Sequence, residues 1–241
     1  MDMAITGTGM IAAGEYDSVR ISGKGKSEGH IRCKDFICSG SFSGASDIEC
    51  ENRMEISGSF KNTGALGTRS LHISGSAENG GAVSAETVST SGRFEVKGII
   101  RASDFSVHGV LVACDDIEVE KVAVHGRISC AGLINAEEFS IKMADNCKSE
   151  AESLGGSLIF IRKKFSLNLF AGIRKAFRFA VPLFTVAESI EGDEIDIEYT
   201  KAKTVRGRSV KIGKGCEIDL IQYTEAADIS PGAKVGKVEK I

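Results

Sequence analysis

The chain contains no tryptophan and only two prolines in its 241 residues, although it contains 28 glycines. Low-complexity, disordered chains that are rich in glycine are commonly rich in proline as well. Proline also cannot donate a hydrogen bond to a sheet ladder, whereas glycine fits tight corners. Abundant glycine without proline is therefore typical of a folded chain with many strands and many corners.

Targeting and membrane-spanning segments are also missing. Residues 1–17 have neither a basic start nor a long apolar stretch, so we expect no signal peptide and no transmembrane anchor. We accordingly expect the protein in the cytoplasm. The formal net charge is only −3, which argues against an overall polyanion-binding protein, and we expect no nucleic acid as a partner.

The seven cysteines include no CxxC motif, and their number is odd. Cys33 and Cys50 stand at a spacing of 17, as do Cys130 and Cys147, so each pair is predicted to stack in one column. These cysteines occupy apolar positions of the repeat described below. This placement favours free thiols that serve as small core residues over disulfides or metal ligands.

No catalytic constellation is apparent. The stretch Gly23–Ser27 (GKGKS) resembles the end of a phosphate-binding loop, but Arg20 stands where that loop needs glycine, and no helix is predicted to follow. His108 and His125 form only a pair, without a third metal ligand beside them. We therefore expect no catalytic residues, no metal and no cofactor.

What the chain does contain is a repeat. A glycine that follows an apolar–polar pair recurs at a spacing of 17 or 18, and we call these positions the anchor glycines. A fixed short period means that each repeat is one structural unit that buries its apolar face against its neighbours. The anchor glycines are Gly23, Gly40, Gly58, Gly75, Gly92, Gly109 and Gly126.

Apolar residues keep fixed distances from the anchor glycines. They stand two and four positions before nearly every anchor glycine and two positions after most of them. A spacing of two is typical of strands, and a repeat of this length holds several short strands but no helix of normal length. The sequence predicts an all-β fold, a parallel β-helix over residues 1–143, with the anchor glycines at corners that need a positive φ. One ladder of buried residues is expected to include Ile21, Ile56, Ile73, Val107 and Val124.

The register stops after Met143. Residues 144–156 are predicted to be a linker, and no acidic residue occurs between Glu152 and Glu188. Within this stretch we expect a helix over Leu169–Val181 that ends at Pro182. Its apolar face carries Phe170, Ile173, Phe177 and Ala180, and its basic residues fan out from the flank to the far side, where Phe179 falls near Lys175. Two alternatives stand beside contact with an anionic membrane surface: packing on the flank of the β-helix, and binding a protein partner. The candidate contact residues are Arg162, Lys163, Lys164, Phe170, Ile173, Arg174, Lys175, Phe177 and Arg178.

The strand pattern returns over residues 188–241. Ile190-Glu191-Gly192 and Val205-Arg206-Gly207 match each other at a spacing of 15. The simplest interpretation is that further coils continue the same β-helix, with the basic segment of 144–187 inserted between them. The alternative is a separate small β unit.

The repeated coils, with their period of 17 or 18, are followed by ESIEGDEIDIEYTKAKTVRGRSVKIGKGCEIDLIQY and AKVGKVEKI. Together these stretches resemble the bactofilins, in particular the longer cytoplasmic members of Gram-positive bacteria. The resemblance covers residues 1–143 and 187–241. It implies a right-handed β-helix that polymerises end to end without nucleotide and often lies under the cell membrane. This chain departs from the family's usual single, uninterrupted core by its interposed basic segment.

These observations predict a structural scaffold rather than an enzyme, with self as the partner and with peripheral association at the inner face of the membrane. The alternatives are a β-helix enzyme of the acyltransferase type and a monomeric binding adaptor. An acyltransferase would show a strict six-residue repeat on all three faces. Open strand edges at the two ends of a β-helix pair with other chains unless something blocks them. The candidate self-association residues are Met3, Ile5, Met10, Ile11, Val235 and Val238.

Overall fold

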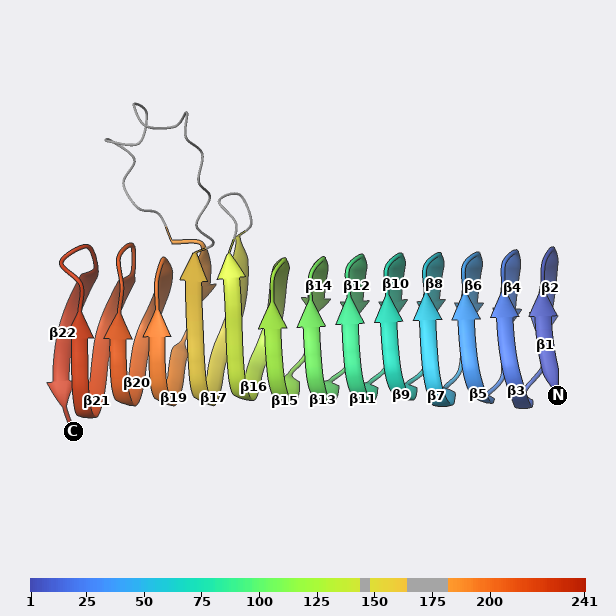
Figure 1. Cartoon of the computed structure of the whole chain (residues 1–241), viewed down its shortest axis with the longest axis horizontal. Coiled ribbons are helices and arrows are strands. Elements are labelled where there is room, and N and C mark those ends of the chain that lie inside the picture. Colours follow the sequence, from blue (N-terminus) through green and yellow to red (C-terminus); the bar gives the residue numbers. More distant parts are fainter. Residues whose placement is uncertain (144–147, 164–181) are drawn as a thin grey trace, which may run out of the picture.

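The computed structural model describes residues 1–143, 148–163 and 182–241. In this part of the chain every regular element is a strand, and the strands form about 13 coils of a parallel β-solenoid. The strands run across a long rod and stack side by side along its axis (Figure 1). The backbone hydrogen bonds between neighbouring coils therefore run along the rod. The predicted all-β, parallel fold is confirmed.

Each coil of the regular part consists of one long and one short strand. In the third coil these are β5 (Ile31–Cys38) and β6 (Ser41–Gly44). The inward residues of β5 are Ile31 and Cys33, then Phe36 and Cys38, so the alternation shifts by one residue between Cys33 and Phe36. That shift marks a corner within the strand. A coil therefore has three faces, which we call the first (Ile31–Cys33), second (Asp35–Cys38) and third (Ser41–Gly44) face.

The strands of the regular part pair with the strand one coil away, as in the Ile31–Ile48 and Phe36–Met54 partnerships. The remaining strands are β1 (Asp2–Ile5), β2 (Thr8–Ile11), β3 (Gly14–Ile21), β4 (Lys24–Ser27), β7 (Ile48–Ile56), β8 (Ser59–Asn62), β9 (Leu66–Ile73), β10 (Ser76–Asn79), β11 (Val83–Thr90), β12 (Arg93–Val96), β13 (Ile100–Val107), β14 (Val110–Ala113), β15 (Ile117–Val124), β16 (Arg127–Met143), β17 (Ser149–Lys163), β18 (Phe184–Val186), β19 (Ser189–Ile197), β20 (Thr200–Ile212), β21 (Glu217–Ile229) and β22 (Lys234–Lys240).

The core is a set of ladders that run the length of the rod. The predicted ladder is confirmed, because each of its five members is at most 1% exposed and members one coil apart are register partners; these are Ile21, Ile56, Ile73, Val107 and Val124. Aromatic rings fill the interior of the third and fourth coils, where the Phe42 and Phe60 rings stack with centroids 5.2 Å apart. Phe36 meets both of these rings edge-on. The residues just before the anchor glycines point outward and are exposed.

Two buried asparagines occupy one inward column of the third face. Asn62 and Asn79 are register partners, and the Asn62 side-chain amide donates a hydrogen bond of 3.2 Å to Oδ1 of Asn79. Each amide also donates to a backbone carbonyl two residues further on, Gly64 and Gly81 respectively. These bonds satisfy the corner backbone after the third face and allow a polar side chain in the core.

The reason for the anchor glycines differs from our expectation. No anchor glycine has a positive φ; among the described residues positive φ is found at Gly14, Tyr199 and Gly215. Instead, a Cβ atom on Gly75 would lie only 2.1 Å from the carbonyl oxygen of Gly58 in the preceding coil. The other anchor glycines show the same close approach. Glycine is therefore required because successive backbones meet at this corner, not because of backbone conformation.

Two parts of the expected insert belong to the rod. The prediction of a linker over 144–156 is wrong for Ser149–Gly156, which lie in β17. The basic stretch contributes Ser157–Lys163 to the same strand, and Phe184–Val186 form β18. The inward alternation persists there through Leu154, Ile159 and Ile161, all buried, although the anchor glycine is lost.

The predicted helix Leu169–Val181 lies outside the described residues. No helix in the described part of the chain is long and apolar enough to cross a membrane.

Residues 188–241 continue the same rod. β17 pairs with β19, and β19, β20, β21 and β22 pair in succession. The two matching triplets are register partners, Ile190 with Val205 and Gly192 with Gly207. Figure 1 shows these coils stacked in line with the earlier ones. The separate β unit that we kept as an alternative is therefore not what the structure contains.

Candidate self-association surfaces

The first coil has an open edge. Among the described strands, β1 pairs only with β3 and β2 only with β4, so their other edges carry unpaired N–H and C=O groups. The corner between them is open as well, because a Cβ atom on Gly7 would meet nothing within 4 Å. Gly7 occupies the corner of the first coil that Gly23 occupies in the second, and each of the anchor glycines Gly23–Gly126 has a preceding coil packed against it. We call this end of the rod the head.

The last coil has a matching open edge, which we call the tail. In the described part of the chain, β22 pairs only with β21, and the segment Ala226–Ile229 pairs only with β20. Val238 is 44% exposed there, although the residue it stacks on, Ile221, is completely buried. The apolar ladder that contains Ile221 and Val238 therefore reaches the tail, where no described residue covers it.

Exposed apolar side chains gather at the two ends. Of the six large hydrophobic residues that are exposed in the described part of the chain, two lie on the flank of the rod, Leu133 and Phe160. The other four belong to the first or last coil: Met1, Met10, Val238 and Ile241. Apolar surface that is left uncovered at the ends is typical of a surface that associates.

The sequence-predicted association residues divide into two groups. Met10 is 63% exposed, and Met3 and Val235 are partly buried, so these side chains and Val238 lie at the surface of the ends. Ile5 and Ile11 instead point into the core and are 7% and 1% exposed. A charged substitution at Ile5 would disturb the first coil itself, so it does not test association. Sequence reasoning missed Met1 and Ile241, which lie outside the periodic pattern.

The two ends differ in charge. Residues 1–17 contain Asp2, Glu15 and Asp17 but no lysine or arginine. A hydrogen bond from Lys34, helped by one from the N-terminal amine, lowers the pKa of Asp17 to about 2, so this carboxylate is ionised at neutral pH. At the tail, residues 226–241 contain three lysines and two acidic residues: Lys234, Lys237, Lys240, Asp228 and Glu239.

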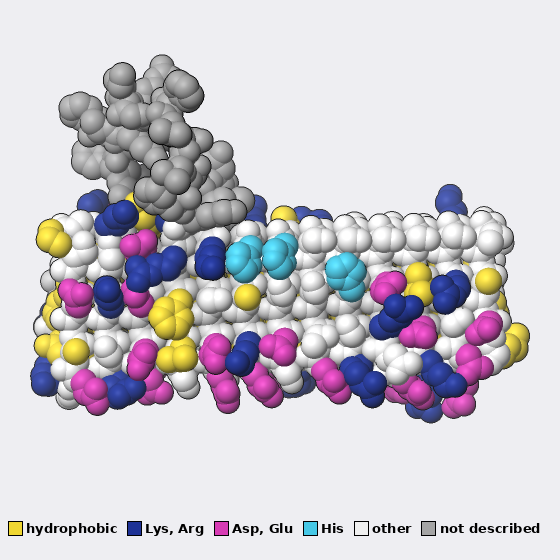
Figure 2. Space-filling model, viewed as in Figure 1, with side chains coloured by type: hydrophobic (Ala, Val, Ile, Leu, Met, Phe, Trp, Pro, Cys, Tyr) yellow, Lys and Arg dark blue, Asp and Glu magenta, His cyan; other side chains and the backbone are white. Residues whose placement is uncertain are grey.

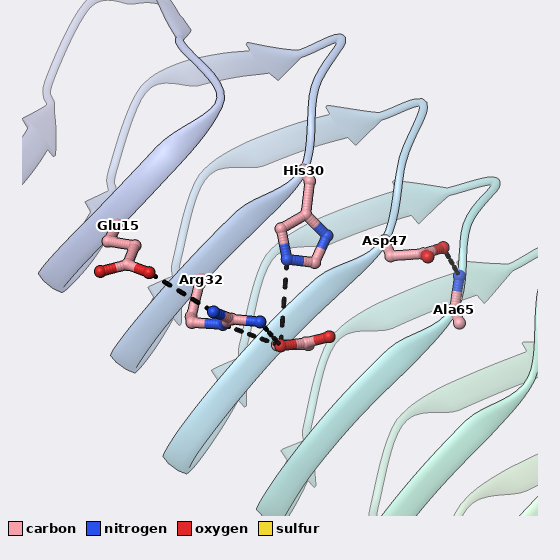
Figure 3. Close-up of polar contacts among 6 residues, drawn as sticks. Glu15, His30, Arg32, Asp47 and Ala65 are labelled. Atoms are coloured by element: carbon pink, nitrogen blue, oxygen red, sulfur yellow. Dashed lines mark hydrogen bonds and ion pairs between the residues drawn. The ribbon is translucent and has the colours of Figure 1, made fainter.

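The flank of the rod is covered by ion pairs that connect neighbouring coils. Arg32 lies between Glu15 and Glu49 of the coils on either side, with N–O distances of 3.4 and 2.8 Å, and His30 also faces Glu49 (Figure 3). Such exposed pairs each contribute little to stability, about 0–1 kcal/mol. Figure 2 shows basic and acidic side chains mixed along the lower part of this face, whereas its upper part is largely uncharged over the N-terminal coils. The charged part of the flank is therefore a mixed, solvated surface.

Only two of the predicted membrane-contact residues lie among the described residues. Arg162 forms ion pairs with Asp196 and Glu198 of a neighbouring coil. The Lys163 ammonium lies 4.9 Å from the centre of the Tyr199 ring. Both side chains are thus engaged by the rod. The remaining candidates lie outside the described residues: Lys164, Phe170, Ile173, Arg174, Lys175, Phe177 and Arg178.

The histidine pair stacks on the surface. The rings of His108 and His125 are 5.0 Å apart and nearly parallel, and the Ser106 hydroxyl lies 3.3 Å from Nδ1 of His108. In the described part of the chain, no group of three or more His, Cys, Asp or Glu residues is placed to hold a metal ion.

Six cysteines lie in the described residues, and all six are free thiols. Cys33 and Cys50 are register partners, as predicted, whereas Cys147 lies outside the described residues. Burial raises the pKa of Cys38, Cys130 and Cys216 to about 11. A hydrogen bond with Cys33 lowers the pKa of Cys50, but Cys50 is only 4% exposed.

Among these six thiols, Cys114 is expected to react first with iodoacetamide, because it alone is exposed and the thiolate is the reactive form. Peptide mapping by mass spectrometry after a brief exposure at pH 7 measures this, with the Cys147 peptide followed separately. A Cys114→Ser variant serves as the control. Equally fast labelling of Cys38 or Cys216 in the native protein would contradict the buried ladder.

Comparisons with known proteins give local similarity only. No protein-family model matches the chain, and no solved structure matches it. It is 45% identical over 60 residues to the uncharacterized protein YhbE of Bacillus subtilis (strain 168), a match that covers 25% of each chain. It is 30% identical over 93 residues to the uncharacterized protein YhbF of the same organism, covering 39% of this chain and 35% of YhbF. The matches thus span a quarter to about a third of the length of these two relatives.

Proposed function

We propose that this protein is a structural scaffold that self-assembles through the two ends of its β-solenoid. The observation that supports this most is the contrast between the ends and the flank. The ends carry open strand edges and four of the six exposed large hydrophobic side chains, whereas the flank carries paired charges. Edge strands of this kind pair with another chain unless a cap or a charge prevents it.

The resemblance to the bactofilins points in the same direction. It adds three proposals: the assembly is cytoskeletal, it needs no nucleotide, and it lies in the cytoplasm at the inner face of the membrane. A membrane contact would depend on the basic residues between Lys163 and Pro182, because Arg162 and Lys163 are held by the rod. These proposals rest on the resemblance to the bactofilins and on the charge of the basic residues between Lys163 and Pro182.

Gly7→Val is expected to abolish assembly while leaving the fold intact. A side chain at Gly7 meets nothing in the single chain, but it projects into the space that a stacked coil would occupy. At every later anchor glycine that space holds the carbonyl of the neighbouring coil. Analytical ultracentrifugation of wild type and variant over a range of concentrations, without nucleotide, measures the effect.

Gly67→Val is the matched control. Gly67 lies on the flank, where an added Cβ would meet only the Glu49 side chain at 3.9 Å, so this variant is expected to assemble like the wild type. Identical sedimentation of the Gly7→Val variant and the wild-type polymer would rule out the head as an association surface. A wild-type chain that stays monomeric at every concentration would refute the scaffold function itself.

A further inference from the structure

We propose that Asn79 is a site of spontaneous deamidation that the fold keeps closed, so that only an unfolded chain reacts there and thereby loses the ability to refold. This inference goes beyond the scaffold function and does not depend on whether the rods assemble. Three observations support it: the residue that follows Asn79, the hydrogen bonds that hold its side chain, and its complete burial.

The sequence makes Asn79 the most reactive asparagine of the chain. An asparagine deamidates when the backbone nitrogen of the next residue attacks its side-chain carbonyl carbon. Among all asparagines of the sequence, only Asn79 is followed by glycine, Gly80. Glycine carries no side chain to hinder the attack, and it gives the backbone the widest range of conformations. In the unfolded chain Asn79 is therefore expected to react before every other asparagine.

The reaction consumes only water. The Gly80 nitrogen loses its proton to hydroxide, forms a bond to Cγ of Asn79 and expels the side-chain nitrogen as ammonia, which leaves a five-membered succinimide. Water then opens one of the two C–N bonds within this ring. Opening at Cγ produces aspartate, and opening at the main-chain carbonyl carbon produces isoaspartate, in which the main chain is longer by one carbon. One water is taken up and one ammonia is released, and nothing is oxidised or reduced.

In the folded chain the side-chain amide of Asn79 is held at both of its polar atoms. Nδ2 donates hydrogen bonds to the carbonyl oxygens of Gly81 at 2.8 Å and of Ala82 at 3.4 Å. Oδ1 accepts a hydrogen bond of 3.2 Å from the side-chain amide of Asn62. The side chain is 0% exposed. Cγ therefore cannot turn toward the Gly80 nitrogen unless these buried hydrogen bonds are broken.

The attacking nitrogen is occupied as well. The Gly80 N–H donates a hydrogen bond of 2.8 Å to the carbonyl oxygen of Asn62 in the preceding coil. The backbone of Asn79 is fixed from both sides, because its register partners are Asn62 in the preceding coil and Val96 in the next. Burial also keeps hydroxide away from the Gly80 proton. The fold thus blocks the nucleophile, the carbon that it attacks and the base.

The reaction products do not fit the place of Asn79. Aspartate lacks both amide hydrogens, so a buried carboxylate would face the carbonyl oxygens of Gly81 and Ala82. Isoaspartate adds a main-chain carbon at the end of β10 and displaces the following residues from their register. A chain that deamidates while it is unfolded is therefore expected to be excluded from the fold permanently.

Mass spectrometry of the Asn79 peptide tests the site and its protection. The full-length chain is incubated at pH 8, once native and once unfolded in guanidinium chloride. Deamidation of Asn79 is expected to be at least about a thousandfold slower in the native chain, because a folded protein is unfolded only about 10⁻³–10⁻⁶ of the time. Asn62 is the internal control, since it shares the buried column but is followed by Thr63. Equal rates for Asn79 in the two states would overturn the protection.

The route of the reaction is tested in the unfolded chain, where the effect of a substitution on folding does not matter. Asn79 is expected to react faster than Asn62 in guanidinium chloride, and Gly80→Val is expected to slow Asn79 to about the rate of Asn62, because its side chain hinders the attacking nitrogen. If Asn79 reacted no faster than Asn62 in the wild type, or if Gly80→Val left its rate unchanged, Asn79 would not be the proposed site.

Refolding tests the consequence. After increasing times in guanidinium chloride the chain is diluted into buffer, and the folded chains are isolated by size-exclusion chromatography. The folded fraction is expected to fall in step with the loss of intact Asn79, and the chains in it are expected to retain asparagine. Folded chains that contain deamidated Asn79 as often as the whole sample does would overturn the exclusion.

A pair of variants gives an independent measurement that needs no prior unfolding. Asn79→Asp reproduces the aspartate product, and Asn52→Asp makes the same change at an exposed asparagine. Asn79→Asp is expected to unfold at a lower urea concentration than the wild type, or to fail to fold, whereas Asn52→Asp is expected to match the wild type. Equal urea midpoints for Asn79→Asp and the wild type would overturn the claim that the product is excluded.

Discussion

Gly75→Ala is expected to lower the free energy of unfolding by about 4 kcal/mol, since overpacking costs about 1–3 kcal/mol and each weakened hydrogen bond adds about 1 kcal/mol. The added Cβ would lie 2.1 Å from the carbonyl oxygen of Gly58 and 2.5 Å from that of Ser57, and both are backbone atoms that cannot rotate away. To relieve this contact the two coils must separate, which stretches the bonds from Ser74 N to Ile56 O (2.9 Å) and from Ser76 N to Gly58 O (2.9 Å). Urea denaturation followed by circular dichroism measures the loss.

The control for this substitution is Gly67→Ala. Its added Cβ would meet only a flexible side chain at 3.9 Å, so its stability is expected to match or slightly exceed that of the wild type. If Gly75→Ala and Gly67→Ala unfolded at the same urea concentration, the backbone approach at the anchor corner would not be the reason for glycine there.

Ile73→Asp is expected to cost on the order of 5 kcal/mol, because the substitution removes a fully buried side chain and places a carboxyl group in a dry column. The register partners of Ile73 are Ile56 and Thr90, and neither offers a cation to the new carboxylate. Thermal unfolding followed by circular dichroism measures the effect. Ser74→Asp is the matched control, since Ser74 is the next residue and points to solvent. Equal losses in the two variants would contradict the inward placement of the ladder.

The repeat period carried most of the fold prediction. Fixed spacings around the anchor glycines identified which side chains point inward, and Ile21, Ile73 and Val124 are buried as expected. The match at a spacing of 15 likewise identified true register partners in Ile190 and Val205. A period of this kind is informative because every coil must repeat the same inward positions to stack on its neighbour.

Other features could not be read from the period. Ser149–Lys163 was missed because its coil keeps the inward alternation but lacks the glycine that marked the other units. Asn62 and Asn79 were not predicted in the core, since only the structure shows the corner carbonyls that accept their hydrogen bonds. At the candidate site, Met10 and Val238 lie exposed, but Ile5 and Ile11 do not, because a periodic pattern cannot distinguish a core residue of an end coil from a surface residue.

The direction of the backbone hydrogen bonds determines how the rod responds to mechanical force. The bonds between coils run parallel to the long axis (Figure 1), so tension along the rod pulls directly on them. Each junction between coils carries the full load, and the junctions act in series, so the weakest one yields first. Bending loads the same bonds on the convex side and compresses them on the concave side. Compression pushes against the close backbone contacts at the anchor corners. The rod should therefore resist compression better than tension, as a strut does and a cable does not.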